Sequence, residues 1–219
     1  MLHYLQALFQ ALDVNSLRDA ALRVAAVFIC LTIHETCHGL AAYALGDPTA
    51  KSMHRLSLNP LRHIDWFGLL MMFMAGFGWA KPVPVDPRYF KKPKQGMALT
   101  ALAGPASNFL LALVTIVISK GILLYCADSP WAETAFVFCL YTLAPLSIGL
   151  GLFNLLPIPP LDGSKVLAVL LPDQAYVRLM RYERYGLLAL LALSYFGLTG
   201  SWISGAIMGV YSTLLNLIY

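Results

Sequence analysis

The feature that most constrains this chain is a set of long runs without Asp, Glu, Lys or Arg. These runs cover residues 95–119, 134–161 and 185–219, which are 25, 28 and 35 residues long. A helix needs about 20 apolar residues to cross a bilayer. The first two runs therefore predict one membrane-spanning helix each. The third run is long enough for two short helices joined by a turn at 199–201.

Composition supports an integral membrane protein. Hydrophobic residues make up 59% of the 219 residues and charged residues only 12%, whereas a soluble domain carries about 25% charged residues. We expect one membrane-embedded domain over 1–219, with the lipid bilayer as a partner. The net charge of +4 is not arranged as a basic stripe with interleaved aromatic residues, so no nucleic-acid partner is expected. Residues 1–17 have the spacing of an interfacial amphipathic arm, although an ordinary packed arm fits as well.

The segment 66–80 is apolar but short, with 15 residues that include three glycines. Irregular backbone at membrane depth is tolerated only against protein. We therefore predict a re-entrant or hairpin element at roughly 64–85. With a further span at 24–45, the predicted fold is an all-α integral membrane bundle of about five transmembrane helices plus this element. The N-terminus is expected outside and the C-terminus in the cytoplasm.

The span at 24–45 contains His34, Glu35 and His38, which form an HExxH sequence. Ionisable groups inside a span are costly, so they indicate a functional site. Positions i and i+4 share one helix face, where two imidazoles can bind one Zn²⁺ and the glutamate can act as general base. The alternative is a pair of buried histidines that hydrogen-bond to their neighbours.

A catalytic zinc site usually has three protein ligands, and Asp162 is the best candidate for the third. It follows the run 134–161, where Pro157, Pro159 and Pro160 break the helix. Irregular backbone at this point leaves Asp162 free to turn back toward a metal. The alternative is an N-cap for a helix over 163–171.

These motifs together resemble the site-2 protease family of intramembrane zinc metalloproteases. HExxH in one span is followed, after a later span, by Asn154-x-x-Pro157 and Asp162-Gly163, and the resemblance covers about Ile33 to Lys165. Further segments agree with the family: Gly46-Asp47-Pro48-Thr49-Ala50, Leu58-Asn59-Pro60, His63-Ile64-Asp65 and Ala103-Gly104-Pro105-Ala106-Ser107-Asn108.

The resemblance implies a role for each matching residue. His34, His38 and Asp162 bind one Zn²⁺ per chain, and Glu35 is the general base. Asn108 and Asn154 face the active site and place the substrate strand or the oxyanion. Gly76–Val85 belongs to a re-entrant hairpin beside the substrate path.

The resemblance also implies a substrate and a location. The substrate is a single-span membrane protein, and the location is the bacterial cytoplasmic membrane. The chain departs from the family pattern at His54, where members often carry Gly, and at Trp66, where they often carry Pro. No PDZ or CBS domain is expected, and the oligomeric state is open.

The site imposes a topology. If 66–80 is re-entrant, the spans at 24–45 and 134–156 run parallel, and Asp162 lies just beyond the helix end that is nearest to His38. If 66–80 crosses the bilayer, the two helices are antiparallel and Asp162 starts at the wrong face. Two other functions remain open at this point: a prenyl-protein endopeptidase-like hydrolase and a metal transporter.

Overall fold

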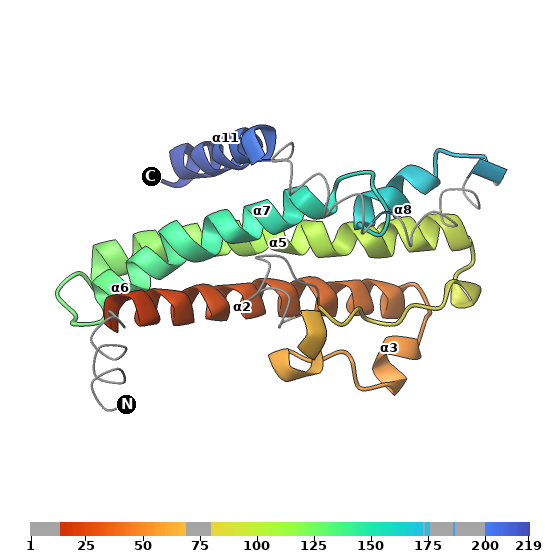
Figure 1. Ribbon diagram of the computed structural model, residues 1–219, viewed down its shortest axis with the longest axis horizontal. Coiled ribbons are helices and arrows are strands. Elements are labelled where there is room, and N and C mark those ends of the chain that lie inside the picture. The colour runs from red at the N-terminus through yellow and green to blue at the C-terminus, as the bar shows by residue number, and fades with distance from the viewer. Residues whose placement is uncertain (1–13, 69–79, 173, 176–185, 187–199) are drawn as a thin grey trace, which may run out of the picture.

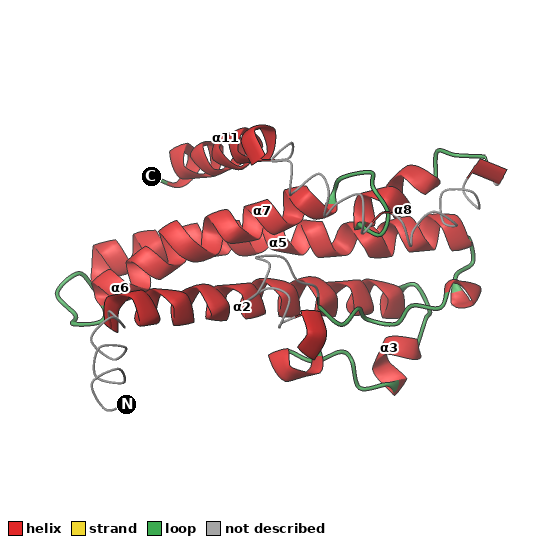
Figure 2. Ribbon diagram, in the orientation of Figure 1, coloured by secondary structure: helices red, strands yellow, loops and turns green. Residues whose placement is uncertain are grey.

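The computed structural model describes residues 14–68, 80–172, 174–175, 186 and 200–219. Within these residues the chain is helical and forms no strand (Figure 2), which confirms the all-α prediction for this part. Three helical stretches are long and apolar enough to cross a membrane, Leu17–Ala44, Pro93–Tyr125 and Ala132–Asn154. The predicted count of about five spans is not confirmed. Most of 185–199 and the first 13 residues of the predicted arm lie outside the described residues.

The bundle is built around two long helices, α2 (Val14–Ala44) and α5 (Pro93–Tyr125), which lie side by side (Figure 1). The third span consists of α6 (Ala132–Val137), the wider turns of η3 (Phe138–Leu143) and α7 (Ala144–Asn154). It ends before residue 161, the limit of the uncharged run. Pro157 follows three residues later, and proline lacks the N–H that would continue the helix.

The direction of the helices agrees with a re-entrant segment after α2. Helices α2 and α7 run the same way, and α5 runs opposite to both (Figure 1). At the described ends of the segment, Ile64 and Ala80 pair as an antiparallel bridge. The Lys81 N–H also donates to the His63 carbonyl at 2.9 Å. The chain therefore returns to the place that it left, while residues 69–79 lie outside the described residues.

Helix α11 (Gly200–Ile218) packs against the third span and α5. The Tyr211 hydroxyl donates to the Leu140 carbonyl at 2.9 Å, and the Tyr219 hydroxyl lies 2.9 Å from Ser119 Oγ. These contacts make α11 antiparallel to α7. The end of the chain therefore lies at the same end of the bundle as the start of α2 (Figure 1). The predicted sides of the two termini stay a prediction.

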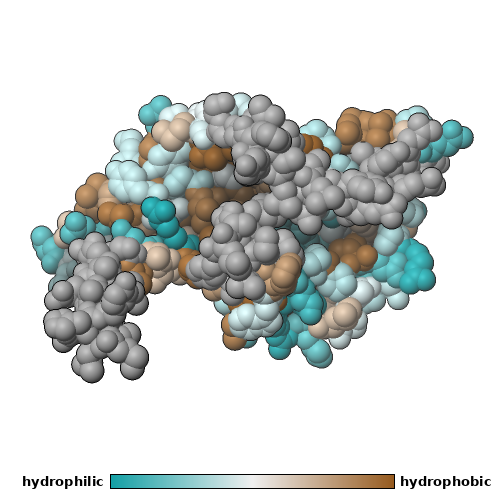
Figure 3. All heavy atoms as spheres, in the orientation of Figure 1, coloured by the Kyte–Doolittle hydropathy of each residue, from teal (hydrophilic) through white to brown (hydrophobic). Residues whose placement is uncertain are grey.

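The helices approach each other through small side chains. Ala26 and Cys30 of α2 are fully buried, as are Ala112 of α5 and Ala144 of α7. Small residues allow close contact between helices that have no hydrophobic advantage over lipid. The outer face carries large apolar side chains, for example Leu110, which is 60% exposed. Hydrophilic residues gather mainly around α3 and the loop after α2, at the lower right of Figure 3.

The loop after α2 contains three short elements, α3 (Thr49–Ser52), η1 (Pro60–Arg62) and η2 (Pro87–Tyr89). His54 follows α3 and has a φ of 54°, in the left-handed region that glycine adopts at little cost. The loop therefore keeps a glycine-type conformation at the position where family members often carry Gly.

We expect that Ala112→Leu lowers the stability of the bundle. Ala112 is fully buried, and overpacking of a tight contact costs about 1–3 kcal/mol. For a chain of this size, that corresponds to a fall in Tm of about 2–12 °C. Val114→Leu is the matched control, because Val114 lies on the same helix and is 44% exposed. Thermal unfolding of the detergent-purified protein measures both variants, and equal Tm values would contradict this packing.

Candidate metal centre

Helix α2 places His34 and His38 one turn apart on the same face. Their Nε2 atoms lie 2.9 Å from each other. The two residues are only 3% and 8% exposed. The HExxH spacing thus brings two ring nitrogens together at a buried point, as the helical period requires.

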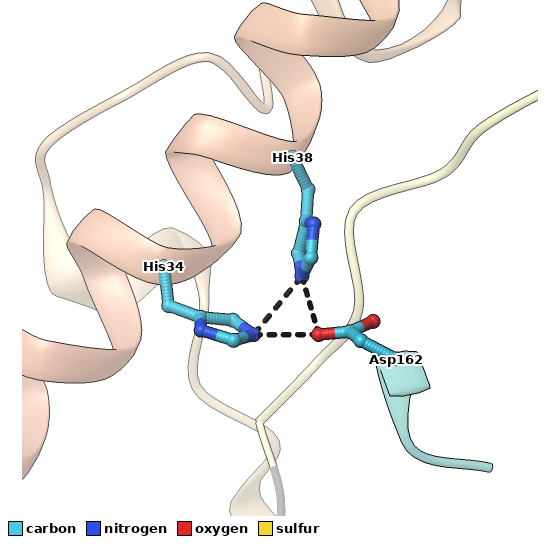
Figure 4. A group of neighbouring side chains, drawn as sticks. All are labelled: His34, His38 and Asp162. Carbon is cyan, nitrogen blue, oxygen red and sulfur yellow. Dashed lines mark hydrogen bonds and ion pairs between the residues drawn. The ribbon is translucent and has the colours of Figure 1, made fainter. Parts of the chain in front are cut away.

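Asp162 reaches the same point from the first residue of α8 (Asp162–Ala168). Its Oδ2 atom lies 3.1 Å from Nε2 of His34 and 3.1 Å from Nε2 of His38. Figure 4 shows the three side chains pointing toward one another from α2 and α8. Asp162 is 6% exposed, so the turn after α7 carries it inward and not toward solvent. Within the described residues, these three form one group able to hold a metal ion.

The close contact between Gly163 and the end of α7 explains how Asp162 reaches the two histidines. A Cβ at Gly163 would lie 2.1 Å from the carbonyl oxygen of Leu155. Only glycine therefore allows the start of α8 to pack against the end of α7 in this way. The Asp-Gly pair in the sequence thus joins a ligand to the residue that positions it.

The charge of Asp162 is stabilised inside the protein. Burial disfavours the carboxylate, but hydrogen bonds with His34 and His38 outweigh burial and hold the pKa of Asp162 below its ordinary value. Lys165 adds to this effect, because its Nζ lies 3.6 Å from Oδ1 of Asp162. The carboxylate therefore stays ionised, the state in which it can bind a cation.

Helix α5 contacts the outer side of both histidine rings. Nδ1 of His38 lies 2.7 Å from the carbonyl oxygen of Thr100. Nδ1 of His34 lies 3.0 Å from the side-chain amide of Asn108. Histidine ligands of metals usually donate their second N–H to such a partner, which fixes the orientation of the ring.

Gly104 of α5 leaves the space that the two rings occupy. A Cβ at this position would lie 2.5 Å from Nε2 of His38 and 2.6 Å from Cε1 of His34. Thr100, Gly104 and Asn108 are four residues apart and lie on one face of α5. The glycine of the GPxxN segment is therefore needed for contact between α5 and the HExxH residues.

Glu35 lies beside this group and is partly buried. Its Oε2 accepts a hydrogen bond of 2.9 Å from the Val83 N–H. Val83 belongs to an extended segment, residues 81–86, which we call the strap. The buried Asp47 fixes the far end of the strap, because its Oδ2 accepts the Asp86 N–H at 2.7 Å. Asp47 belongs to the Gly-Asp-Pro-Thr-Ala segment, and no role for it was predicted from the sequence.

His34, His38, Asp162 and Glu35 line one cleft of about 280 Å³, together with strap residues and Asn154. The Asn154 side chain donates to the Leu150 carbonyl in its own helix. Asn108, in contrast, is fully buried behind His34. The structure therefore places Asn154 at the cleft and Asn108 beside a histidine ring.

The three inward-facing atoms suit Zn²⁺. A tetrahedral zinc ion with bonds of about 2.0–2.1 Å spaces its ligand atoms about 3.3 Å apart. The two Nε2 atoms and the Asp162 oxygen lie 2.9–3.1 Å apart, so a small outward movement of each would accommodate the ion. Two imidazoles and one carboxylate are also a common ligand set of catalytic zinc, with a fourth position left for water or substrate.

Comparison with known proteins agrees with a zinc-binding site in this chain. Residues 120–195 match the family model of Peptidase family M50. "Putative zinc metalloprotease YwhC" of Bacillus subtilis is 39% identical over 175 residues, which are 78% of this chain and 78% of that protein. The chain belongs to peptidase family M50, the site-2 protease family. It is accordingly a metalloendopeptidase.

A more distant relative agrees with this assignment. "Putative zinc metalloprotease Rip2" of Mycobacterium tuberculosis is 28% identical over 194 residues, 86% of this chain and 72% of that protein. No solved structure matches the chain. The stretch matched by the family model contains Asp162 but not the HExxH residues. The distances between side chains in the structure are what join Asp162 to His34 and His38 in one centre.

We expect that Gly104→Ala destroys metal binding, whereas Gly121→Ala does not. The added methyl at 104 would overlap both ligand rings, and the one at 121 would meet no atom within 4 Å. Both changes remove a glycine from α5, so their effects on helix propensity are matched. Zinc content per chain, measured by mass spectrometry on the purified variants, checks this. Full zinc content in Gly104→Ala would contradict the packing of α5 against the centre.

Proposed function

We propose that the chain is a zinc metalloprotease that hydrolyses peptide bonds of single-span membrane proteins near one face of the bilayer. The observation that carries this proposal is the convergence of His34, His38 and Asp162 in one cleft with Glu35. Membership of family M50 and the names of the relatives support zinc as the metal.

Zinc, when bound, supplies a Lewis acid that lowers the pKa of a water molecule and polarises a carbonyl. Glu35 then accepts the proton of the attacking water and delivers it to the leaving nitrogen. Within the described residues, the Val83 N–H donates a hydrogen bond to Oε2 of Glu35. This contact fixes the carboxylate and leaves Oε1 of Glu35 for the water molecule. Pro82 and Pro84 flank Val83 and have no N–H. Of residues 82–84, Val83 alone can therefore donate a backbone hydrogen bond to Glu35.

The hydrogen bonds of a helix bear on the form of the substrate. In a helix the carbonyl oxygens are occupied by internal hydrogen bonds. The substrate must therefore unwind before its scissile bond reaches the centre. The polar side chain of Asn154 at the cleft is suited to donate to the developing oxyanion.

The position of the centre along α2 suggests where cleavage occurs. His38 is six residues from Ala44, the last residue of α2, which is about 9 Å from that helix end. The strap, the start of α5 and α8 lie toward the same end of the bundle (Figure 1). The basic residues from Lys81 to Lys94 and Lys165 belong to this part of the chain. By the positive-inside rule this end faces the cytoplasm, so cleavage occurs near the cytoplasmic face. The start of α2 and the C-terminus then lie on the outer side.

We considered two other functions, a prenyl-protein endopeptidase and a metal transporter. Membership of family M50 argues against the first. A transporter usually has polar ligands along a path through several spans, whereas one group of three metal-ligating residues is found in the described part of this chain.

We expect that Glu35→Gln keeps zinc and loses cleavage. Gln has the same shape and can still accept from Val83, but it cannot take a proton, and a general base contributes about 10²–10⁴-fold. The assay uses a fluorogenic peptide with one apolar helix of about 20 residues, reconstituted with the enzyme in liposomes. The matched control is Glu133→Gln, at an exposed position of α6. Cleavage at the wild-type rate by Glu35→Gln would exclude Glu35 as the base.

The orientation is tested by cysteine labelling. In a background in which the four native cysteines are replaced by alanine, a membrane-impermeant maleimide added to intact cells should modify Asp128→Cys and Tyr219→Cys, because both positions lie at the outer end. Lys91→Cys should react only after the cells are permeabilised. All three side chains are exposed in the structure. Labelling of Lys91→Cys in intact cells would contradict this orientation, because position 91 would then lie on the outer side of the membrane.

A further inference from the structure

One buried amide beside the metal centre is not satisfied as it stands. Asn108 is fully buried, and its Oδ1 atom has no hydrogen-bond partner among the described residues. Its Nδ2 atom faces Nδ1 of His34 at 3.0 Å. A buried acceptor without a partner is costly, so the orientation of this amide needs a physical reason.

Metal binding defines the proton positions on both histidine rings. A neutral imidazole carries one N–H, and its other nitrogen has the lone pair that binds a metal. The Nε2 atoms of His34 and His38 point to the centre, so Nδ1 of each ring must carry the proton and needs an acceptor. For His38 the acceptor is the Thr100 carbonyl at 2.7 Å.

For His34 the only described group in hydrogen-bonding contact with Nδ1 is the Asn108 amide. With Nδ2 facing the ring, the N–H of His34 would meet an N–H of Asn108. The nitrogen and oxygen ends of an amide have nearly the same shape, and their assignment follows from the hydrogen bonds that they make. Exchange of the two ends places Oδ1 against the Nδ1–H of His34 and moves Nδ2 to the position where Oδ1 has no described partner.

We propose that Asn108 is a positioning residue that presents its amide oxygen to the Nδ1–H of His34 and so holds Nε2 ready for the metal. In this role Asn108 acts through His34 and not on the substrate, since it is 0% exposed. Thr100 performs the same task for His38 from two turns earlier on α5. The inference rests on the proposed zinc centre and extends it to the residues behind the ligands.

The chain offers three informative variants. Asn108→Leu keeps the size of the side chain and removes the acceptor. Asn108→Asp keeps the shape and supplies an oxygen at either end. Thr115→Val is the control, because Thr115 is buried on the same helix and its hydroxyl donates to the Ala112 carbonyl of that helix.

Zinc affinity, measured by competition with a chromophoric chelator, is the readout. Loss of a partner behind a ligand typically weakens metal binding by about 10–100-fold, which is the effect expected for Asn108→Leu. Asn108→Asp should bind zinc at least as tightly as the wild type, and Thr115→Val should be unchanged. Wild-type affinity in Asn108→Leu would overturn the proposal, as would an equal loss in a folded Asn108→Asp. A wild type that binds no zinc would instead overturn the proposed function.

Discussion

The approach of three polar groups inside the bundle is the constraint on which the rest of the structure depends. Two imidazole nitrogens and a carboxylate oxygen lie 2.9–3.1 Å apart, almost without access to solvent. Buried lone pairs and a buried charge at such distances are costly unless a proton or a cation lies between them. The arrangement is therefore best explained by a bound cation, and the ligand set favours zinc.

Helix α5 makes this approach possible although it contributes no ligand. Gly104 leaves room for the rings, and Thr100 and Asn108 contact their outer nitrogens. The strap acts in a similar way on the other side, where Val83 holds Glu35 and Asp47 holds the strap. Positioning by backbone groups and by rigid helices keeps a catalytic group within a few tenths of an ångström of its working place, which such sites require.

Much of this centre could be predicted from the sequence. The HExxH spacing on a helix determines that His34 and His38 face one way, and the prolines before Asp162 indicate where the chain can turn back. The partners behind the ligands could not be predicted, because Thr100 and Val83 act through backbone atoms that any residue type provides. Their contacts join segments 48–62 residues apart, which no local pattern encodes. The side of the C-terminus could not be predicted with the same certainty, because it depends on the number of crossings in 185–219, where apolar length alone allows more than one answer.

The central claim is that HExxH and Asp162 form one zinc site. Metal content by mass spectrometry on detergent-purified protein tests it most directly, with His38→Ala, Asp162→Ala and the exposed control Asp128→Ala beside the wild type. The account predicts about one zinc per chain in the wild type and the control, and little or none in the other two variants. Full zinc content in Asp162→Ala would contradict it, because the third ligand would then have to come from elsewhere.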